Sequence, residues 1–183
     1  MNNQLQKLSI AILTLIMLTS CAEELDFSQF NDVEATPTYE ASILYLEAPE
    51  NIINLVNVAD DVFSQNFNFD AFSANIFAER VIEGTITYVI ENTTSKELEI
   101  DIEFLDDDGN VTDTEIFTIL PAPTAIIERE IAYGPSGQSI DIITTLSTIR
   151  VTARNLGDNT SQSDLSDPMI TVKSSGKFRV RLK

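Results

Sequence analysis

An aspartate-rich stretch, Asp106-Asp107-Asp108-Gly109-Asn110, has the residue types that bind calcium. An EF-hand loop places acids or amides at positions 1, 3 and 5, glycine at 6 and glutamate at 12. Counted from Asp106, glycine falls at position 4 and Phe117 at position 12, so the stretch is not an EF-hand. An Asp-Gly hairpin turn accounts for the same residues. A weak calcium site of another type, formed by Asp106, Asp108 and Asn110, is the alternative.

Glu128 and Glu130 have the spacing that places two carboxylates on one face of a strand. Glycoside hydrolysis needs two carboxyl groups roughly 5 to 9.5 Å apart across a cleft, and this pair is the least arbitrary choice among 29 acidic residues. Two acids on a solvent-exposed strand face are the more common reason for such spacing. A carboxylate-dependent hydrolase is therefore an alternative and not the main prediction.

Histidine is absent, and Cys21 is the single cysteine. Ser-His-acid catalysis, Cys-His catalysis and nearly all zinc sites need an imidazole or a thiolate. The sequence also has no glycine-rich phosphate-binding motif. We therefore expect a protein that is not an enzyme and needs no cofactor.

The sequence before Cys21 indicates export. Lys7 precedes a short apolar run from Leu8 to Leu18, which is the arrangement of an export signal. A membrane-spanning helix needs about 20 apolar residues, so the run is too short for one. Leu18-Thr19-Ser20-Cys21 resembles the lipobox of bacterial lipoproteins. An ordinary secretory signal that contains a cysteine is the alternative.

The lipobox resemblance implies a lipid anchor. In that family the cysteine thiol is acylated with diacylglycerol, the preceding peptide is removed, and the new amino terminus receives a further acyl chain. One acyl chain alone binds a membrane only marginally, whereas two or three attach a protein stably. The resemblance implies that residues 1–20 are a signal peptide and that Cys21 is the lipidation site.

The residues after the cysteine, Ala22-Glu23-Glu24, bear on the destination. The residue directly after Cys21 is Ala22. An aspartate at that position would resemble the signal that retains lipoproteins in the inner membrane, so its absence favours the outer membrane. Glu23 and Glu24 also resemble the surface-export signal of lipoproteins from Bacteroidota such as flavobacteria, although an acidic linker can produce such a pair by chance. We expect an outer-membrane lipoprotein exposed at the cell surface.

The charge of the chain limits its partners. The formal net charge is −18, and removal of residues 1–20, which contain one lysine and no acid, leaves −19. Such a protein is repelled by nucleic acid and by anionic lipid surfaces. The chain is 43% hydrophobic, with its branched and aromatic residues in patterned runs, which excludes a disordered acidic protein.

Strict alternation of apolar and polar residues predicts antiparallel strands with one wet face. It is clearest over 80–91 and 97–104, and a third strand follows over 111–120. We expect these three strands to form a meander, followed by strands over 124–133 and 148–153 and by one bent or two short strands over 169–182. The first strand is expected over 39–47.

Two segments favour short helices. Pro49-Glu50 suits the first turn of a helix in which Ile52, Leu55 and Val56 share one face. The segment 138–146 fits a helix with Ile140, Ile143 and Leu146 on one side, although a strand also fits. Five phenylalanines lie within 60–79 and are expected in the core or in a lid, with a hydrophobic ligand groove as the alternative; they are Phe63, Phe67, Phe69, Phe72 and Phe77.

About seven short strands joined by polar turns indicate a mainly β fold, an antiparallel β-sandwich of immunoglobulin or fibronectin-like type. The expected organisation is a signal peptide over 1–20, an acidic tether over 21–38 and a single domain over 39–183. The tether residues from Ala22 to Thr38 could span at most about 55 Å at ~3.3 Å per residue.

The main functional prediction is a non-catalytic interaction or structural module of the cell envelope. Its partner would be an unidentified envelope protein or a glycan, in addition to the membrane that holds the lipid anchor. A glycan-binding accessory lipoprotein is the principal alternative, although such modules commonly stack sugars on exposed aromatic rings. The chain has no tryptophan, and its four tyrosines are Tyr39, Tyr45, Tyr88 and Tyr133.

Charge is sorted by strand face. In the last strand Lys177, Arg179, Arg181 and Lys183 alternate with apolar residues, and in the strand at 97–104 Glu97, Glu99, Asp101 and Glu103 do the same. Opposite charges on neighbouring strands contribute roughly 0.2–1 kcal/mol per pair. We expect these two strands to be near neighbours in one sheet. The alternative is an edge strand whose cations deter aggregation or contact lipid phosphates.

Overall fold

The computed structural model describes residues 3–4, 7, 34–57, 60–69, 75–123 and 125–182. The chain divides into two compact units, Met1–Glu34 and Ala35–Lys183. Cys21, Glu23 and Glu24 lie outside the described residues, as does Phe72. No helix among the described residues is both long and apolar enough to cross a membrane.

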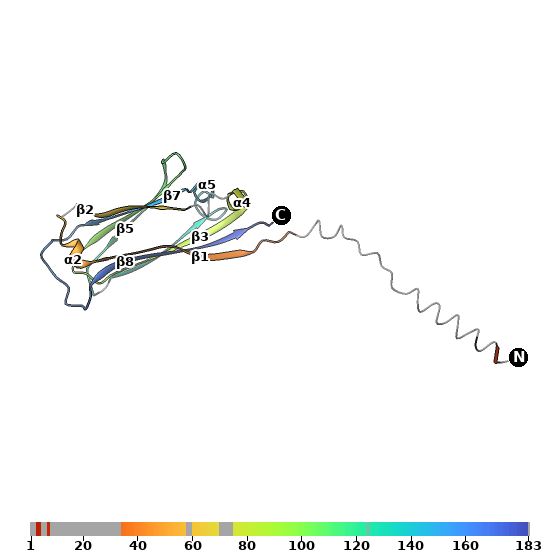
Figure 1. Ribbon diagram of the computed structural model, residues 1–183, viewed down its shortest axis with the longest axis horizontal. Coiled ribbons are helices and arrows are strands. Elements are labelled where there is room, and N and C mark those ends of the chain that lie inside the picture. The colour runs from red at the N-terminus through yellow and green to blue at the C-terminus, as the bar shows by residue number, and fades with distance from the viewer. Residues whose placement is uncertain are drawn as a thin grey trace. The chain divides into compact units, whose positions relative to one another are not determined.

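The second unit is a sandwich of two antiparallel sheets (Figure 1). This confirms the predicted mainly β fold, an antiparallel β-sandwich with short helices. The first sheet has the order β1-β8-β3-β6 and the second β2-β7-β4-β5. The strands are β1 (Thr38–Pro49), β2 (Asp61–Asn68), β3 (Val81–Asn92), β4 (Leu98–Leu105), β5 (Val111–Ile119), β6 (Ala125–Tyr133), β7 (Thr148–Asn155) and β8 (Met169–Val180).

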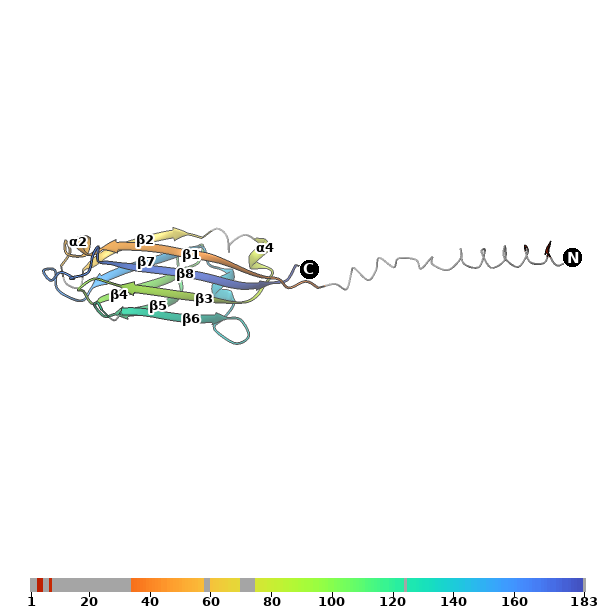
Figure 2. The same cartoon turned by 90° about the horizontal axis from the view of Figure 1, so that it is seen from below.

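The strand order shows which kind of β-sandwich the domain is. An immunoglobulin domain of the seven-stranded type has an ABED sheet and a CFG sheet. Here eight strands divide four and four, and except for the β4-β5 hairpin each connection crosses from one sheet to the other, which is the arrangement of a double-sheet jelly roll. In Figure 2 the first sheet lies in front of the second.

The expected three-strand meander is wrong. β4 and β5 form the predicted hairpin, but β3 lies in the other sheet, where it pairs with β6 and β8. The cause is the segment 93–97, which crosses between the sheets instead of turning back beside β3. Two of its side chains, Thr94 and Lys96, are fully buried.

The core lies between the sheets, as the alternation predicts. In β4 the inward residues Leu98, Ile100 and Ile102 are at most 1% exposed, and Tyr88 of β3 is equally buried. Their side chains pack against inward residues of the facing sheet, for example Tyr88 against Phe117 with ring centroids 5.3 Å apart. Strand formation therefore follows the hydrophobic pattern closely.

The predicted pairing of the acidic strand with the C-terminal basic strand is wrong. The acidic strand is β4, and the basic strand β8 lies in the other sheet between β1 and β3. β4 pairs instead with β7, whose Arg154 lies 2.6 Å from Asp101 Oδ2 and 2.5 Å from Glu99 Oε1. Arg150 lies 3.0 Å from Glu103. Two arginines of this sequence-distant neighbour thus pair with three of the four acids on that face, Glu99, Asp101 and Glu103.

The short helices are α2 (Glu50–Ile53), α4 (Asn75–Ala78) and α5 (Asp141–Thr144). α5 confirms the helix expected over 138–146, with Ile143 and Leu146 fully buried. α2 begins where Pro49 predicts, but its buried residue is Ile53, whereas Ile52 is 44% and Leu55 79% exposed. α2 ends after one turn, so the expected face over Ile52, Leu55 and Val56 does not form. Phe63, Phe67, Phe69 and Phe77 pack against the core.

The two ends of the sandwich differ in what they carry. We call the end where β1 begins the near end and the end where β1 reaches Pro49 the far end. The near end carries α4, α5 and the Asp106–Asn110 turn, and the far end carries α2 with the segments 93–97 and 156–168 (Figure 1). Because β1 has 12 residues, the ends are about 40 Å apart at ~3.3 Å per residue.

Candidate functional site

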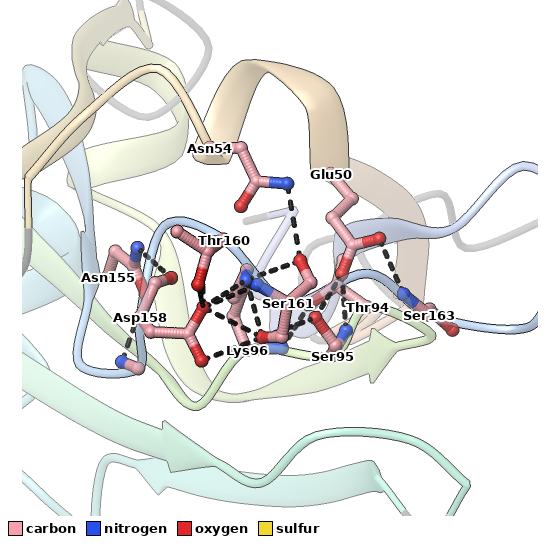
Figure 3. Close-up of polar contacts among 11 residues, drawn as sticks. Glu50, Asn54, Thr94, Ser95, Lys96, Asn155, Asp158, Thr160, Ser161 and Ser163 are labelled. Carbon is pink, nitrogen blue, oxygen red and sulfur yellow. Dashed lines mark hydrogen bonds and ion pairs between the residues drawn. The ribbon is translucent and has the colours of Figure 1, made fainter.

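A cluster of polar side chains occupies the far end of the sandwich (Figure 3). It joins three segments that are distant in the sequence: α2, the crossing segment 93–97 and the loop 156–168. We call it the far-end cluster. Its members are Glu50, Asn54, Thr94, Ser95, Lys96, Asn155, Asp158, Thr160, Ser161 and Ser163.

Lys96 is the central member of the far-end cluster. Its side chain is 0% exposed, and its ammonium group donates to Asp158 Oδ1 at 3.0 Å, the Ser161 carbonyl at 2.6 Å and Ser161 Oγ at 2.7 Å. An ammonium has three donors, so all of them are used. A lysine is almost never fully buried unless it is paired, and here the pairing fixes the loop 156–168 to the crossing segment.

Asp158 organises the loop that receives Lys96. Its Oδ1 accepts hydrogen bonds from the backbone amides of Thr160 at 2.7 Å and Ser161 at 2.6 Å. These two bonds, together with the Lys96 ammonium, hold the pKa of Asp158 well below its usual value. The carboxylate therefore stays ionised and keeps the loop folded around the lysine.

Glu50 is the second buried charge of the cluster, at 4% exposure. Its Oε1 accepts from the Ser95 amide and hydroxyl, both at 2.6 Å, and its Oε2 accepts from the Ser163 amide at 2.9 Å. Burial alone would raise its pKa, but these hydrogen bonds and the nearby Lys96 charge outweigh burial and lower the pKa. Glu50 thus connects α2 to both other segments.

Two asparagines support the ends of the neighbouring strands. Asn92 donates to the carbonyls of Lys96 at 2.7 Å and Leu120 at 2.9 Å. Asn155 donates to the Asp158 carbonyl at 3.0 Å and accepts from the Gly157 amide at 3.0 Å. These bonds satisfy backbone groups that leave the sheets, so the far end is held rigidly without regular structure.

A cleft of about 690 Å³ opens beside the far-end cluster. Small-molecule sites typically have volumes of roughly 300–1,000 Å³. The cleft is lined by Pro49, Glu50, Asn51, Asn54, Gln162, Ser163, Asp167, Pro168 and Met169. We call it the far-end cleft. Lys96 has no free donor and both Glu50 oxygens already accept hydrogen bonds, so the main groups available to a ligand are the side-chain amides, the Asp167 carboxylate and an apolar surface.

The calcium candidates lie at the opposite end, in the β4-β5 turn. Asp106 Oδ1 accepts from the amides of Asp108 at 3.0 Å and Asn110 at 2.8 Å, and the Asn110 side chain donates to both Asp106 oxygens. Gly109 has a φ of 82°, as an Asp-Gly turn requires. The side-chain bond from Asn110 is the main cause of a lowered Asp106 pKa. Among the described residues, no group of three or more acids or thiols is placed to hold a metal ion.

The carboxylates considered for hydrolysis lie on β6. Glu128 and Glu130 are both exposed, and Arg129 between them points to the other face of β6, where it is 42% exposed and lies 4.2 Å above the Phe117 ring and 3.1 Å from Glu115. Glu130 borders a hollow on the outer face of the first sheet together with Lys177. The pair is therefore a strand face turned to solvent, away from the far-end cleft.

The far-end cluster is not predictable from the sequence pattern. Lys96 lies in a Thr-Ser-rich turn, where a lysine is expected to be solvated, and Asp158 lies 62 residues further on. The only local signal is the run Asp158-Asn159-Thr160-Ser161, which is typical of a carboxylate capping the next backbone amides. Glu50 was expected only as the start of a helix.

Comparisons with known proteins give only distant structural likeness. No protein-family model and no curated protein matches the chain. The VP2 subviral particle of infectious bursal disease virus is 13% identical with a TM-score of 0.33, over 82% of this chain and 33% of that chain. The Desmodium yellow mottle tymovirus structure is 6% identical with a TM-score of 0.37, over 82% of this chain and 89% of that chain. This chain spans about a third of the VP2 chain.

Proposed function

We propose that this protein is a lipid-anchored component of the bacterial outer membrane, exposed at the cell surface, whose jelly-roll domain is a non-catalytic binding module. The observation that carries the proposal is the sequence Leu18-Thr19-Ser20-Cys21 after a short apolar run, with the only cysteine of the chain at the lipobox position. The acids Glu23 and Glu24 support export to the outer face.

The geometry of the domain suits display from an anchor. β1 begins at the near end, so any segment that precedes the domain is joined to it at that end. The far-end cleft opens about 40 Å away at ~3.3 Å per strand residue. A domain held through its near end therefore leaves the cleft free to meet a ligand.

The chemistry of the cleft supports binding rather than catalysis. A general acid or base must exchange a proton near the working pH. Glu50 has both oxygens engaged by Ser95 and Ser163 and a lowered pKa, so it remains an ionised structural acceptor. Lys96 is fully buried and fully paired.

The anchor is tested by changing Cys21 to serine in a Bacteroidota host. We expect the variant to lose palmitate labelling and to leave the membrane fraction. Ser20→Ala is the matched control, because it keeps a small residue before the cysteine and should remain in the membrane fraction. Continued membrane partitioning of the Cys21→Ser protein would contradict the proposal.

Surface exposure is tested by adding protease to intact cells. We expect the wild-type domain to be degraded and the Glu23→Ala, Glu24→Ala double variant to be protected. The control removes the same charge further along the tether, with Asp32→Ala and Glu34→Ala, and should remain accessible. Equal protection of the wild type and the Glu23, Glu24 variant would rule out the export signal.

A further inference from the structure

We infer that the far-end cleft binds a neutral saccharide, with the amide side chains of Asn51, Asn54 and Gln162 as its hydrogen-bonding groups. The inference rests on the proposed function for the access of the cleft to external ligands.

The amides of the cleft match the hydrogen bonding of sugar hydroxyls. A hydroxyl both donates and accepts, and a side-chain amide presents an acceptor and two donors. Asn51 and Gln162 are exposed and lie on different segments, α2 and the loop 156–168. A ligand between them can therefore be held from two sides.

Asn54 leaves an acceptor unused at the wall of the cleft. Its Nδ2 makes one long hydrogen bond of 3.4 Å to the Ser161 carbonyl, and its Oδ1 is buried with no partner among the described residues. A buried acceptor without a hydrogen-bond donor is unfavourable, because it has lost its bonds to water. A small turn of the amide toward a ligand hydroxyl would satisfy it.

The cleft does not suit an anionic ligand. None of its nine lining residues is a lysine or an arginine. Lys96 is the nearest base in the far-end cluster, and its three donors are all used inside the protein. Asp167 and Glu50 make the lining negative, so phosphate, sulfate and uronate groups are disfavoured.

The cleft does not suit a peptide bound as an added strand either. That mode depends on unpaired main-chain hydrogen-bonding groups. Pro49 and Pro168 have no N–H, Pro49 is paired with Met169 at the ends of β1 and β8, and the Glu50 amide is bonded to the Pro168 carbonyl at 2.9 Å. The same prolines and Met169 form an apolar surface on which the C–H face of a sugar ring can lie.

Asp167 shows that the loop is held in an unusual conformation at the cleft. Its φ of 51° lies in the left-handed region, and it precedes Pro168, where an extended backbone is preferred. Such conformations persist only when the surroundings impose them, and they gather at ligand sites. The exposed Asp167 carboxylate lines the cleft, where it can accept a hydrogen bond from a hydroxyl.

The test uses the full chain, purified in a detergent without a sugar headgroup, on an array of neutral and acidic oligosaccharides. We expect binding to neutral oligosaccharides, measured again by titration of the best one. Asn51→Ala and Gln162→Ala together should weaken binding roughly tenfold or more, the effect of losing hydrogen bonds to the ligand. Gln65→Ala is the matched control, because Gln65 is exposed on β2, outside the cleft.

The outcomes separate this inference from the proposed function. Absence of neutral saccharide binding, binding to acidic glycans or peptides only, or equal affinity of the Asn51, Gln162 variant would each overturn the saccharide site. None of these results changes the fractionation of the Cys21→Ser protein, which tests the anchor. The thermal midpoints of both variants should equal that of the wild type, so that lost binding cannot arise from unfolding.

Discussion

Lys96 and Asp158 form an ion pair whose two members differ completely in exposure. Lys96 Nζ lies 3.0 Å from Asp158 Oδ1, yet the lysine side chain is 0% and the aspartate side chain 57% exposed. The lysine depends on the protein for all its hydrogen bonds, whereas the aspartate keeps contact with water. Removing Asp158 would therefore leave a buried charge, whereas removing Lys96 would leave a charge that water can reach.

This inequality predicts an order of stabilities. Asp158→Ala leaves a buried cation without its counter-charge, whereas Lys96→Met removes the charge and leaves an exposed carboxylate that water can solvate. We expect Lys96→Met to lower the free energy of unfolding by about 1–3 kcal/mol and Asp158→Ala to lower it more. The double variant should be more stable than Asp158→Ala alone in urea unfolding. An equal loss for both single variants would contradict the buried-cation account.

The charged face of the second sheet predicts coupling between β4 and β7. Arg154 contacts Glu99 and Asp101 on the neighbouring strand, so Arg154→Ala and Glu99→Ala should be non-additive by about 0.2–1 kcal/mol at low salt. Arg179 provides the control, because it pairs with Glu83 in the other sheet at 3.0 Å. Double-mutant cycles by urea unfolding give the coupling free energy of Glu99 with Arg154 and that of Glu99 with Arg179. Coupling of Glu99 to Arg179 instead of Arg154 would contradict the strand order.

Phe178 predicts which glycines are required by packing. Its ring lies over Gly84 of β3 and Gly176 of β8, so that a methyl group at either position would overlap the ring. We expect Gly84→Ala to lower the free energy of unfolding by about 1–3 kcal/mol. Adding Phe178→Leu should recover part of that loss, because a smaller side chain makes room for the methyl group. A Gly84→Ala protein with an unchanged urea midpoint would show that the ring lies elsewhere.

Glu50 predicts how stability depends on pH. Its folded pKa is lowered, so the unfolded chain binds a proton first and the stabilising effect is present above the usual pKa of about 4.3 and lost as pH falls below it. Glu50→Gln should therefore be less stable than wild type at pH 7, by about 1–3 kcal/mol, and the difference should shrink below pH 4. The comparison with Glu50→Gln is needed because burial raises the pKa of Glu115. Glu115 therefore favours folding as pH falls, which is opposite to the effect of Glu50. A difference that stays constant from pH 7 to 3 would contradict a role for the Glu50 charge.

The parts of the fold that follow local rules could be predicted from the sequence. The alternation in β4 gave both the strand and its buried face, and Asp108-Gly109 gave the turn after it. The crossing of 93–97 between sheets could not be predicted, because it depends on Lys96 meeting Asp158 and Ser161 from a distant loop. The far-end cleft could not be predicted for the same reason.

The charge pairing shows the same limit. The acidic face of β4 was evident, but the pattern could not show which basic strand faces it. Arg150 and Arg154 also share one face of a strand, and only the jelly-roll order brings β7 rather than β8 beside β4. Sequence alternation gives the face of a side chain, whereas its neighbour is set by long-range connections.

Thiol labelling of intact cells tests the central proposal most directly. Leu55 is 79% exposed at the far end, and Cys21 is the only natural cysteine. In a Bacteroidota host, we predict that a membrane-impermeant maleimide labels the Leu55→Cys protein on intact cells. The wild type should remain unlabelled, because the proposed lipid anchor occupies its single thiol. Labelling of Leu55→Cys only after the cells are broken, or labelling of the wild type at Cys21, would contradict the account of an acylated, outward-facing protein.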